Sequence, residues 1–143
     1  MKKIFKTLLK CKLFISISFL TLALPVSIKA QNTPIIYQNW KMIGESPTNY
    51  EVSALILRCH PDSVAQVHIE LFNEGIGAQT AHFNLTITSP SNNENIQREI
   101  SYSMAQGDMI KPLCENNNHP LLRINFPANW DPAAVIFTLT FIP

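Results

Sequence analysis

Histidine and methionine side chains are the residues of this chain best suited to binding a ligand chemically. Imidazole and thioether groups both bind copper, and imidazole also binds zinc. His68 and His82 lie at similar distances before and after a glycine-containing turn, on the outward-facing parity of two apparent strands. If those strands pair, the two histidines approach each other across the ladder. The same pattern is also expected of two histidines that simply face the solvent, and the sequence indicates no third ligand. We therefore keep a metal-binding protein as the alternative to the function predicted below.

Two cysteines of the chain are candidates for a disulfide bond. Cys59 and Cys114 lie beyond the amino-terminal segment that we expect to be removed, and an even number of cysteines in an exported domain indicates a disulfide. A Cys₂His₂ metal set with His60 and His119 is the rival. Its spacing matches no zinc-finger pattern, and adjacent Cys–His ligands are awkward. We therefore predict a Cys59–Cys114 disulfide.

Catalytic motifs are not evident. Ser46 lies in a GESP segment that lacks the second glycine and the strand–turn–helix context of a nucleophile elbow, so we interpret it as a turn serine. The acidic residues form no recognisable catalytic pair, and there is no phosphate-binding glycine loop. We predict a protein that is not an enzyme and has no cofactor. A small secreted hydrolase, assembled wholly by the tertiary structure, is the third reading.

The first 30 residues have the pattern of a secretory signal peptide. A lysine-rich start is followed by the apolar run Leu13–Leu24, which is shorter than the ~20 residues of a membrane-spanning helix. We expect cleavage after Ala30, and cleavage after Ser27 and an uncleaved anchor are the alternatives. Cleavage after Ala30 leaves one domain, residues 31–143, with five basic and ten acidic residues and a net charge of −5. That charge argues against nucleic-acid binding, and no second segment has membrane length. We expect a secreted or periplasmic protein.

Period-2 alternation of apolar residues indicates strands throughout residues 31–143. The clearest stretch is Val67–Ile87, which we interpret as two strands joined by a turn in which Gly75 and Gly77 adopt positive φ. Further strands are expected over residues 35–42, 50–60, 96–104, 122–126 and 135–141. Residues 109–114 are broken by Pro112 and are expected to form an edge or irregular segment. Seven or eight short strands without a convincing helix predict a single antiparallel β-sandwich of immunoglobulin-like type.

One part of this stretch resembles a known class of domain. FNEGIGAQTAHFNLTI, Phe72–Ile87, is similar to the pattern of CARDB-type and related immunoglobulin-like bacterial domains, in which an apolar strand runs into Asn-x-Gly and then an alternating strand. The resemblance covers about 16 residues. It implies a sandwich with an adhesive or accessory role, and it carries no catalytic residues.

Surface recognition is therefore the favoured function. The candidate binding residues are Trp130 in a PANWDP corner and the polar loop Asn116, Asn117 and Asn118, whereas Trp40 is expected in the core. Edge strands offer strand addition to a protein partner. We predict an exported, non-catalytic binding or accessory protein of the cell envelope or extracellular space. It would bind a protein or cell-surface ligand through sandwich loops or an edge strand.

Overall fold

The computed structural model describes residues 33–116 and 118–143. Within that range the chain forms eight β-strands and one short 3₁₀ helix, Pro120–Leu122. No helix in the described part is long and apolar enough to span a membrane. The signal peptide predicted for residues 1–30 and the candidate Asn117 lie outside the described residues.

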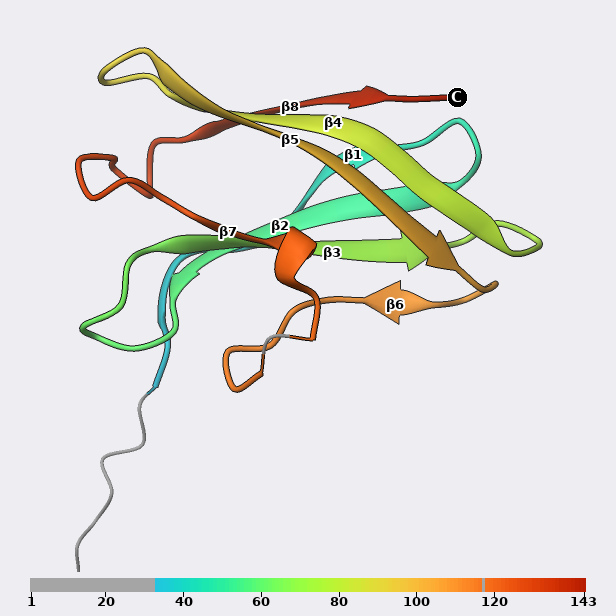
Figure 1. Cartoon of the computed structure of the whole chain (residues 1–143), viewed down its shortest axis with the longest axis horizontal. Helices are drawn as coiled ribbons and strands as arrows, with labels where there is room; N and C mark the ends of the chain where they lie inside the picture. The colour runs from blue at the N-terminus through green and yellow to red at the C-terminus, as the bar shows by residue number, and fades with distance from the viewer. Residues whose placement is uncertain (1–32, 117) are drawn as a thin grey trace, which may run out of the picture. The chain divides into compact units, whose positions relative to one another are not determined.

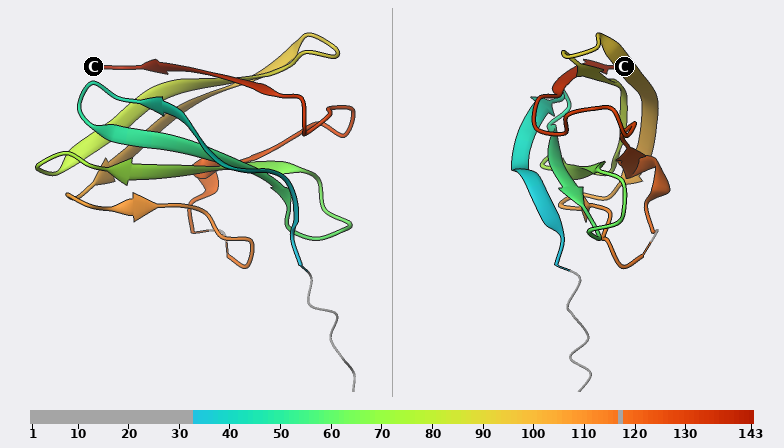
Figure 2. Two further views of the ribbon diagram at one scale, coloured as in Figure 1. Left: turned by 180° about the vertical axis from the view of Figure 1, so that it is seen from behind. Right: turned by 90° about the vertical axis from the view of Figure 1, so that its left-hand side faces the viewer.

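The strands form two antiparallel sheets that face each other as layers (Figures 1 and 2). The prediction of an all-β sandwich is confirmed. In the larger sheet β1, β2 and β3 follow in order, and β6 and β7 both pair along the far side of β3. In the smaller sheet β4 lies between β5 and β8. The strands are β1 (Ile35–Glu45), β2 (Tyr50–Arg58), β3 (Gln66–Asn73), β4 (Gln79–Ser89), β5 (Glu94–Met104), β6 (Met109–Ile110), β7 (Arg123–Asn125) and β8 (Ile136–Phe141).

The core lies between the layers and is built by the predicted alternation. The inward side chains of β2, β3 and β4, and Ile100 on β5, have almost no exposed surface, and each contributes roughly 1.5–3 kcal/mol relative to its exposed state. Their outward neighbours are mostly polar or half-buried. The fully buried members include Val52, Ile56, Val67, Ile69, Leu71, Phe83, Leu85, Ile87 and Ile100.

The stretch from Val67 to Ile87 is not a hairpin, and that prediction is wrong. β3 belongs to the larger sheet and β4 to the smaller one, so the connection between them crosses from one layer to the other. The chain crosses back after β5 and again after β7. Such crossings between two sheets give the Greek-key connections of immunoglobulin-like sandwiches.

Asn73 organises the crossing, because its buried side chain satisfies backbone groups on two connections. Its Nδ2 donates to the carbonyl oxygens of Gly77 and Ala105 at 2.9 and 2.8 Å. Its Oδ1 accepts from the Gly75 N–H at 2.9 Å and from the Gln79 side chain. A buried polar side chain is tolerated when it is bonded in this way. The side chain therefore ties the β3–β4 crossing to the β5–β6 turn.

The two glycines of the crossing do not have the positive φ that we predicted. Of the described glycines, Gly107 has positive φ, at 75°. Gly75 is required instead for close approach, because a Cβ there would lie 3.1 Å from Asn73 Oδ1 and 3.3 Å from the Thr48 carbonyl oxygen. A Cβ at Gly77 would meet open space.

The predicted disulfide is confirmed. Cys59, directly after β2, is joined to Cys114, which follows β6, with a Cα–Cα distance of 5.4 Å. The bond closes a loop with a sequence separation of 55. A loop of this length stabilises the fold by about 4 kcal/mol in the chain-entropy model.

Candidate functional site

Three of the four outer sheet edges carry a feature that discourages pairing with another strand. On the larger sheet, one edge is formed by the two-residue β6 and the three-residue β7, and the other by β1, whose pairing with β2 has three register shifts. On the smaller sheet, the edge strand β5 carries Glu94, Arg98 and Glu99. Short strands, bulges and charged side chains are the usual ways of protecting an edge.

β8 is the exception. Its sequence IFTLTF contains no charged residue and no proline, and its register with β4 runs without a shift from Ile136 to Phe141. Ile142 N–H donates to the His82 carbonyl, so alternation directs the backbone groups of Phe137, Leu139 and Phe141 away from β4. Among the described strands, none is hydrogen-bonded to β8 on that side, although β1 lies close to it: a Cβ at Gly44 would lie 3.0 Å from the Leu139 side chain.

A groove lies between β1 and the beginning of β8, next to the first residues of this open edge. It has a volume of about 320 Å³, and Gln38 holds the two sides together by donating to the Ala133 carbonyl at 2.9 Å. Met42 and Ile136 line it and are 49 % and 55 % exposed. The groove therefore offers apolar side-chain contacts next to unpaired backbone groups. Its lining residues are Gln38, Lys41, Met42, Ile43, Val135, Ile136 and Phe137.

Trp40, on β1, is exposed rather than part of the core, so the prediction for this residue is wrong. Its pairing register explains the difference. Gln38 lies opposite Ile56 and Lys41 opposite Ala54, so β1 has one extra residue between these rungs. A bulge of this kind interrupts the alternation and redirects a side chain. Trp40 is thereby left 39 % exposed on the strand that borders the groove.

Trp130 has the opposite environment and is not an exposed anchor. It is 5 % exposed and stacks on Phe126, with ring centroids 5.7 Å apart. Its indole N–H donates to Glu94 Oε2 at 2.7 Å, which satisfies the one polar atom of the ring. Trp130 therefore has a packing role, contrary to its selection as a binding residue.

The asparagine loop is exposed at Asn116 and Asn118. The backbone of Asn116 is held from below, because Arg123 Nη2 donates to its carbonyl at 2.7 Å and also to the Leu113 carbonyl. Asn116 and Asn118 are both exposed, and recognition by this loop stays a prediction.

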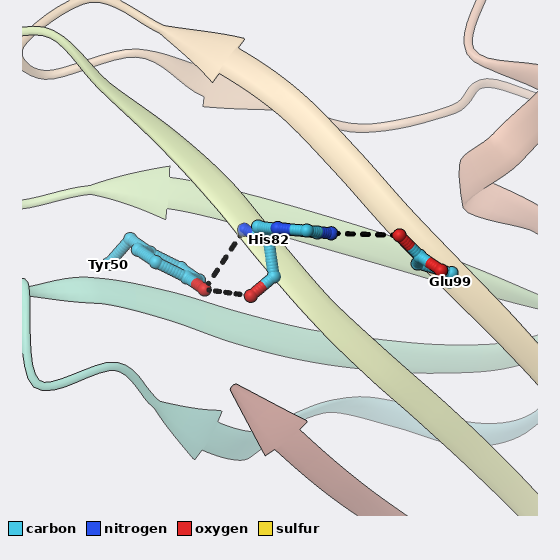
Figure 3. Close-up of polar contacts among 3 residues, drawn as sticks. All are labelled: Tyr50, His82 and Glu99. Carbon is cyan, nitrogen blue, oxygen red and sulfur yellow. Dashed lines mark hydrogen bonds and ion pairs between the residues drawn. The ribbon is translucent and has the colours of Figure 1, made fainter. Parts of the chain in front are cut away.

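The two histidines of the metal-binding alternative lie on different sheets, so their predicted approach across one ladder is wrong. His82 is on β4 in the smaller sheet, where its Nε2 pairs with Glu99 Oε1 on β5 at 2.9 Å. On its other side, the Tyr50 hydroxyl accepts from the His82 N–H and donates to its carbonyl (Figure 3). This hydroxyl joins the two layers at the end of the β4–β8 ladder.

His68 is on β3 and is buried, although alternation predicted an outward, wet position. The disulfide and the segment around Pro112 cover the outer side of the sheet at this point. His68 Nε2 lies 3.9 Å from Cys59 Sγ and 3.1 Å from Gln66 Oε1, and the ring also hydrogen-bonds the Pro112 backbone. Burial, reinforced by the nearby Arg123 guanidinium, lowers the pKa of His68 to about 4. The ring is therefore neutral at pH 7.

The other residues of the rival metal set are not gathered around the cysteines. His60 is exposed, and the His119 ring packs edge-on against Tyr102 at 5.8 Å. His68 takes the place beside the disulfide instead. Sequence spacing could not have shown this, because it depends on the pairing of β2 with β3 and on the return of the chain to Cys114.

Ser46 is placed as its turn composition indicated. It is buried, its Oγ accepts the Thr48 N–H at 3.1 Å, and it lies 2.9 Å from Thr48 Oγ1. These contacts close the turn between β1 and β2.

Comparison of the chain with protein-family models, with curated proteins and with solved structures found no match. The resemblance of Phe72–Ile87 to CARDB-type domains therefore stays a prediction.

Proposed function

We propose that this domain is a non-catalytic binding protein that takes up an extended polypeptide segment at the open edge of β8. The observation that carries the proposal is the contrast among the four edges: β8 alone, of the edges in the described residues, has neither charges nor a register shift nor very short strands. Unpaired backbone groups on a regular, uncharged edge are a template for another strand.

The groove indicates the chemistry of the segment. Main-chain hydrogen bonds to Phe137, Leu139 and Phe141 supply the ladder, while Met42 and Ile136 accept apolar side chains. Trp40 adds a large exposed contact on β1, and tryptophan is enriched among residues that dominate binding energy. The favoured ligand is a segment with apolar residues at alternate positions and no proline at its centre.

The disulfide fits an exported protein. Cysteine pairs persist in oxidising compartments and are rare in the cytosol. Together with the signal-like start of the chain, this supports a place in the periplasm or outside the cell, where the domain acts as an accessory or adhesive module.

A matched pair of lysine substitutions tests the proposal. Thr86 on β4 lies opposite Thr138 on β8 and opposite Gln97 on β5, and both of these residues are exposed. Thr138→Lys places a charge on the open edge, and Gln97→Lys places the same charge on the protected one. The probe is a labelled nine-residue peptide in which valine and threonine alternate between terminal lysines, followed by fluorescence anisotropy. The same peptide with its central residue replaced by proline is the ligand control.

We expect the parent and Gln97→Lys proteins to bind the alternating peptide equally and Thr138→Lys to bind it at least about tenfold more weakly, because an edge charge opposes strand addition. Equal binding by all three, or equal binding of the proline peptide, would refute the proposal. Sedimentation of the parent protein alone shows whether a second copy already occupies the edge. If the parent protein is a dimer and Thr138→Lys is a monomer, the edge of β8 binds a second copy of this chain, and the proposal of a foreign segment is refuted.

A further inference from the structure

Three metal-binding side chains from separate parts of the chain meet beside the disulfide. The donor atoms of Cys59, His68 and Cys114 all lie within 4.8 Å of one another. Cys59 and His68 are 5 % and 2 % exposed, and Cys114 is half-buried. The residue directly after β2, one residue of β3 and the loop that follows β6 therefore bring these donors to one point.

The chemistry of this set is that of a zinc site once the sulfurs are reduced. Two thiolates and one imidazole are common zinc ligands, and three protein ligands leave one position open. Gln66 Oε1 lies 3.1 Å from His68 Nε2 and 3.8 Å from Cys59 Sγ, within reach of that position. Metal-bound histidines usually donate their second ring N–H to a fixed acceptor. The carbonyl of Pro112 is such an acceptor, since proline has no N–H and the His68 ring already bonds its backbone.

We propose that reduction of the Cys59–Cys114 disulfide converts this cluster into a zinc-binding site formed by Cys59, Cys114 and His68. A dithiol supplies two electrons and two protons, which cleave the sulfur–sulfur bond to two thiols, and the dithiol closes to its own disulfide. Zn²⁺ then binds both sulfurs as thiolates, with release of two protons, and His68 contributes an uncharged nitrogen ligand.

Reduction followed by zinc binding would replace the disulfide by a metal-mediated link between the same two segments. The end of β2 is joined to the loop after β6 by a covalent bond when oxidised and by the metal when reduced. Leu113 and Asn116, which flank Cys114, are anchored separately by Arg123, so the loop stays near β3 while the sulfurs separate. This site is distant in the sequence from β8, and the inference does not depend on the proposed strand addition.

Metal titration of the reduced protein tests the site. The purified protein is reduced anaerobically with an immobilised dithiol, which is then filtered away so that no soluble thiol competes for metal. Co²⁺ is added first as a spectroscopic probe, because tetrahedral cobalt–thiolate coordination has characteristic absorption, and Zn²⁺ is then added to displace it. The oxidised protein is titrated in parallel. Circular dichroism follows the β-sheet signal in each state.

His68→Gln and His60→Gln are the matched variants. His60 lies next to Cys59 but is exposed and outside the cluster, and glutamine keeps a polar side chain at each position. We expect the reduced parent and His60→Gln proteins to bind one Co²⁺ with the tetrahedral signature, and the oxidised protein to show none. His68→Gln should bind at least about tenfold more weakly, since even loss of an outer partner costs a metal site that much.

Two results would overturn the inference. One is a reduced parent protein that shows no tetrahedral signature or binds no more tightly than His68→Gln. The other is loss of the β-sheet signal on reduction that zinc does not restore, because the metal would then not hold the folded arrangement.

Discussion

β5 and β8 flank the same central strand, β4, yet present opposite surfaces to a potential partner. β5 is eleven residues long and carries Glu94, Arg98 and Glu99, whereas β8 is six residues long and uncharged. The charges of β5 are also used within the fold, since Glu99 pairs with His82 and Glu94 accepts from Trp130. The charged side chains of the β5 edge are therefore bonded within the domain, whereas β8 is joined to it by its ladder with β4 and by the half-buried side chains of Phe137, Leu139 and Phe141.

The largest effect should come from the strand that both edges share. Leu85 on β4 is fully buried and lies opposite Arg98 on one side and Leu139 on the other. Leu85→Ala removes buried methyl groups and leaves a cavity, so we expect the free energy of unfolding to fall by about 3 kcal/mol in urea denaturation. A loss below about 1 kcal/mol would mean that the two edges are not held by a common core.

Lowering the pH should reduce the free energy of unfolding without changing peptide binding at the edge of β8. The pKa of His68 is lowered from 6.5 to about 4 in the folded protein, so the unfolded chain binds the proton more readily. The stabilisation is complete above pH 6.5 and is lost as the pH falls toward 4, by about 2–3 kcal/mol.

Urea denaturation of the oxidised protein at pH 7, 5.5 and 4 measures this loss. β8 has no titratable side chain, so peptide binding by the protein that stays folded should not follow the same curve. His68→Gln is the control. If its stability falls as steeply as that of the parent over this range, His68 is not the responsible group.

Removing one charge from the protected edge should have a moderate effect on stability alone. Glu94→Ala leaves the buried Trp130 indole N–H without its carboxylate partner, which should cost roughly 1–2 kcal/mol. Thermal unfolding measures the change, and binding of the alternating peptide is expected to remain at the parent level. Reduced peptide affinity in the folded variant would show that the two edges are coupled.

The smallest effect on stability should accompany a clear effect on binding. Ile136→Ala on β8 truncates a side chain that is 55 % exposed in the groove, so stability should change by no more than about 0.5 kcal/mol. Peptide affinity should fall by about tenfold, because apolar contact is lost. Leu121→Ala is the control, since Leu121 is 54 % exposed and does not line the groove. Equal effects of the two substitutions would argue against the groove.

The sequence predicted the features that depend on local pattern. Alternation identified the strands and the inward residues of β4, and cysteine number with compartment identified the disulfide. The sequence-based predictions were wrong where the position of a residue depends on a segment far away in the chain. The β3–β4 connection has turn composition, but local alternation does not distinguish a hairpin from a crossing between layers. The crossing depends on Asn73, whose partner at Ala105 is 32 residues away.

The candidate site was missed for related reasons. The extra residue between Gln38 and Lys41 exposes Trp40, and no local signal marks it in an otherwise alternating strand. His68 has the parity of a wet residue and is covered only because the chain returns to Cys114. The uncharged stretch IFTLTF is visible in the sequence, and it becomes informative once the sheet order places it at an edge.

The length of β8 sets how long a bound segment can stay. Only three residues of β8 direct their backbone groups outward, and each main-chain hydrogen bond contributes about 1 kcal/mol net. The outward N–H and C=O groups of these three residues can therefore contribute up to about 6 kcal/mol, which falls within the roughly 4–15 kcal/mol that immobilising a partner costs. The ladder therefore fixes the direction and register of the segment, and the side-chain contacts in the groove determine its residence time. Exchange should be rapid, and lasting attachment requires several such domains acting on one target.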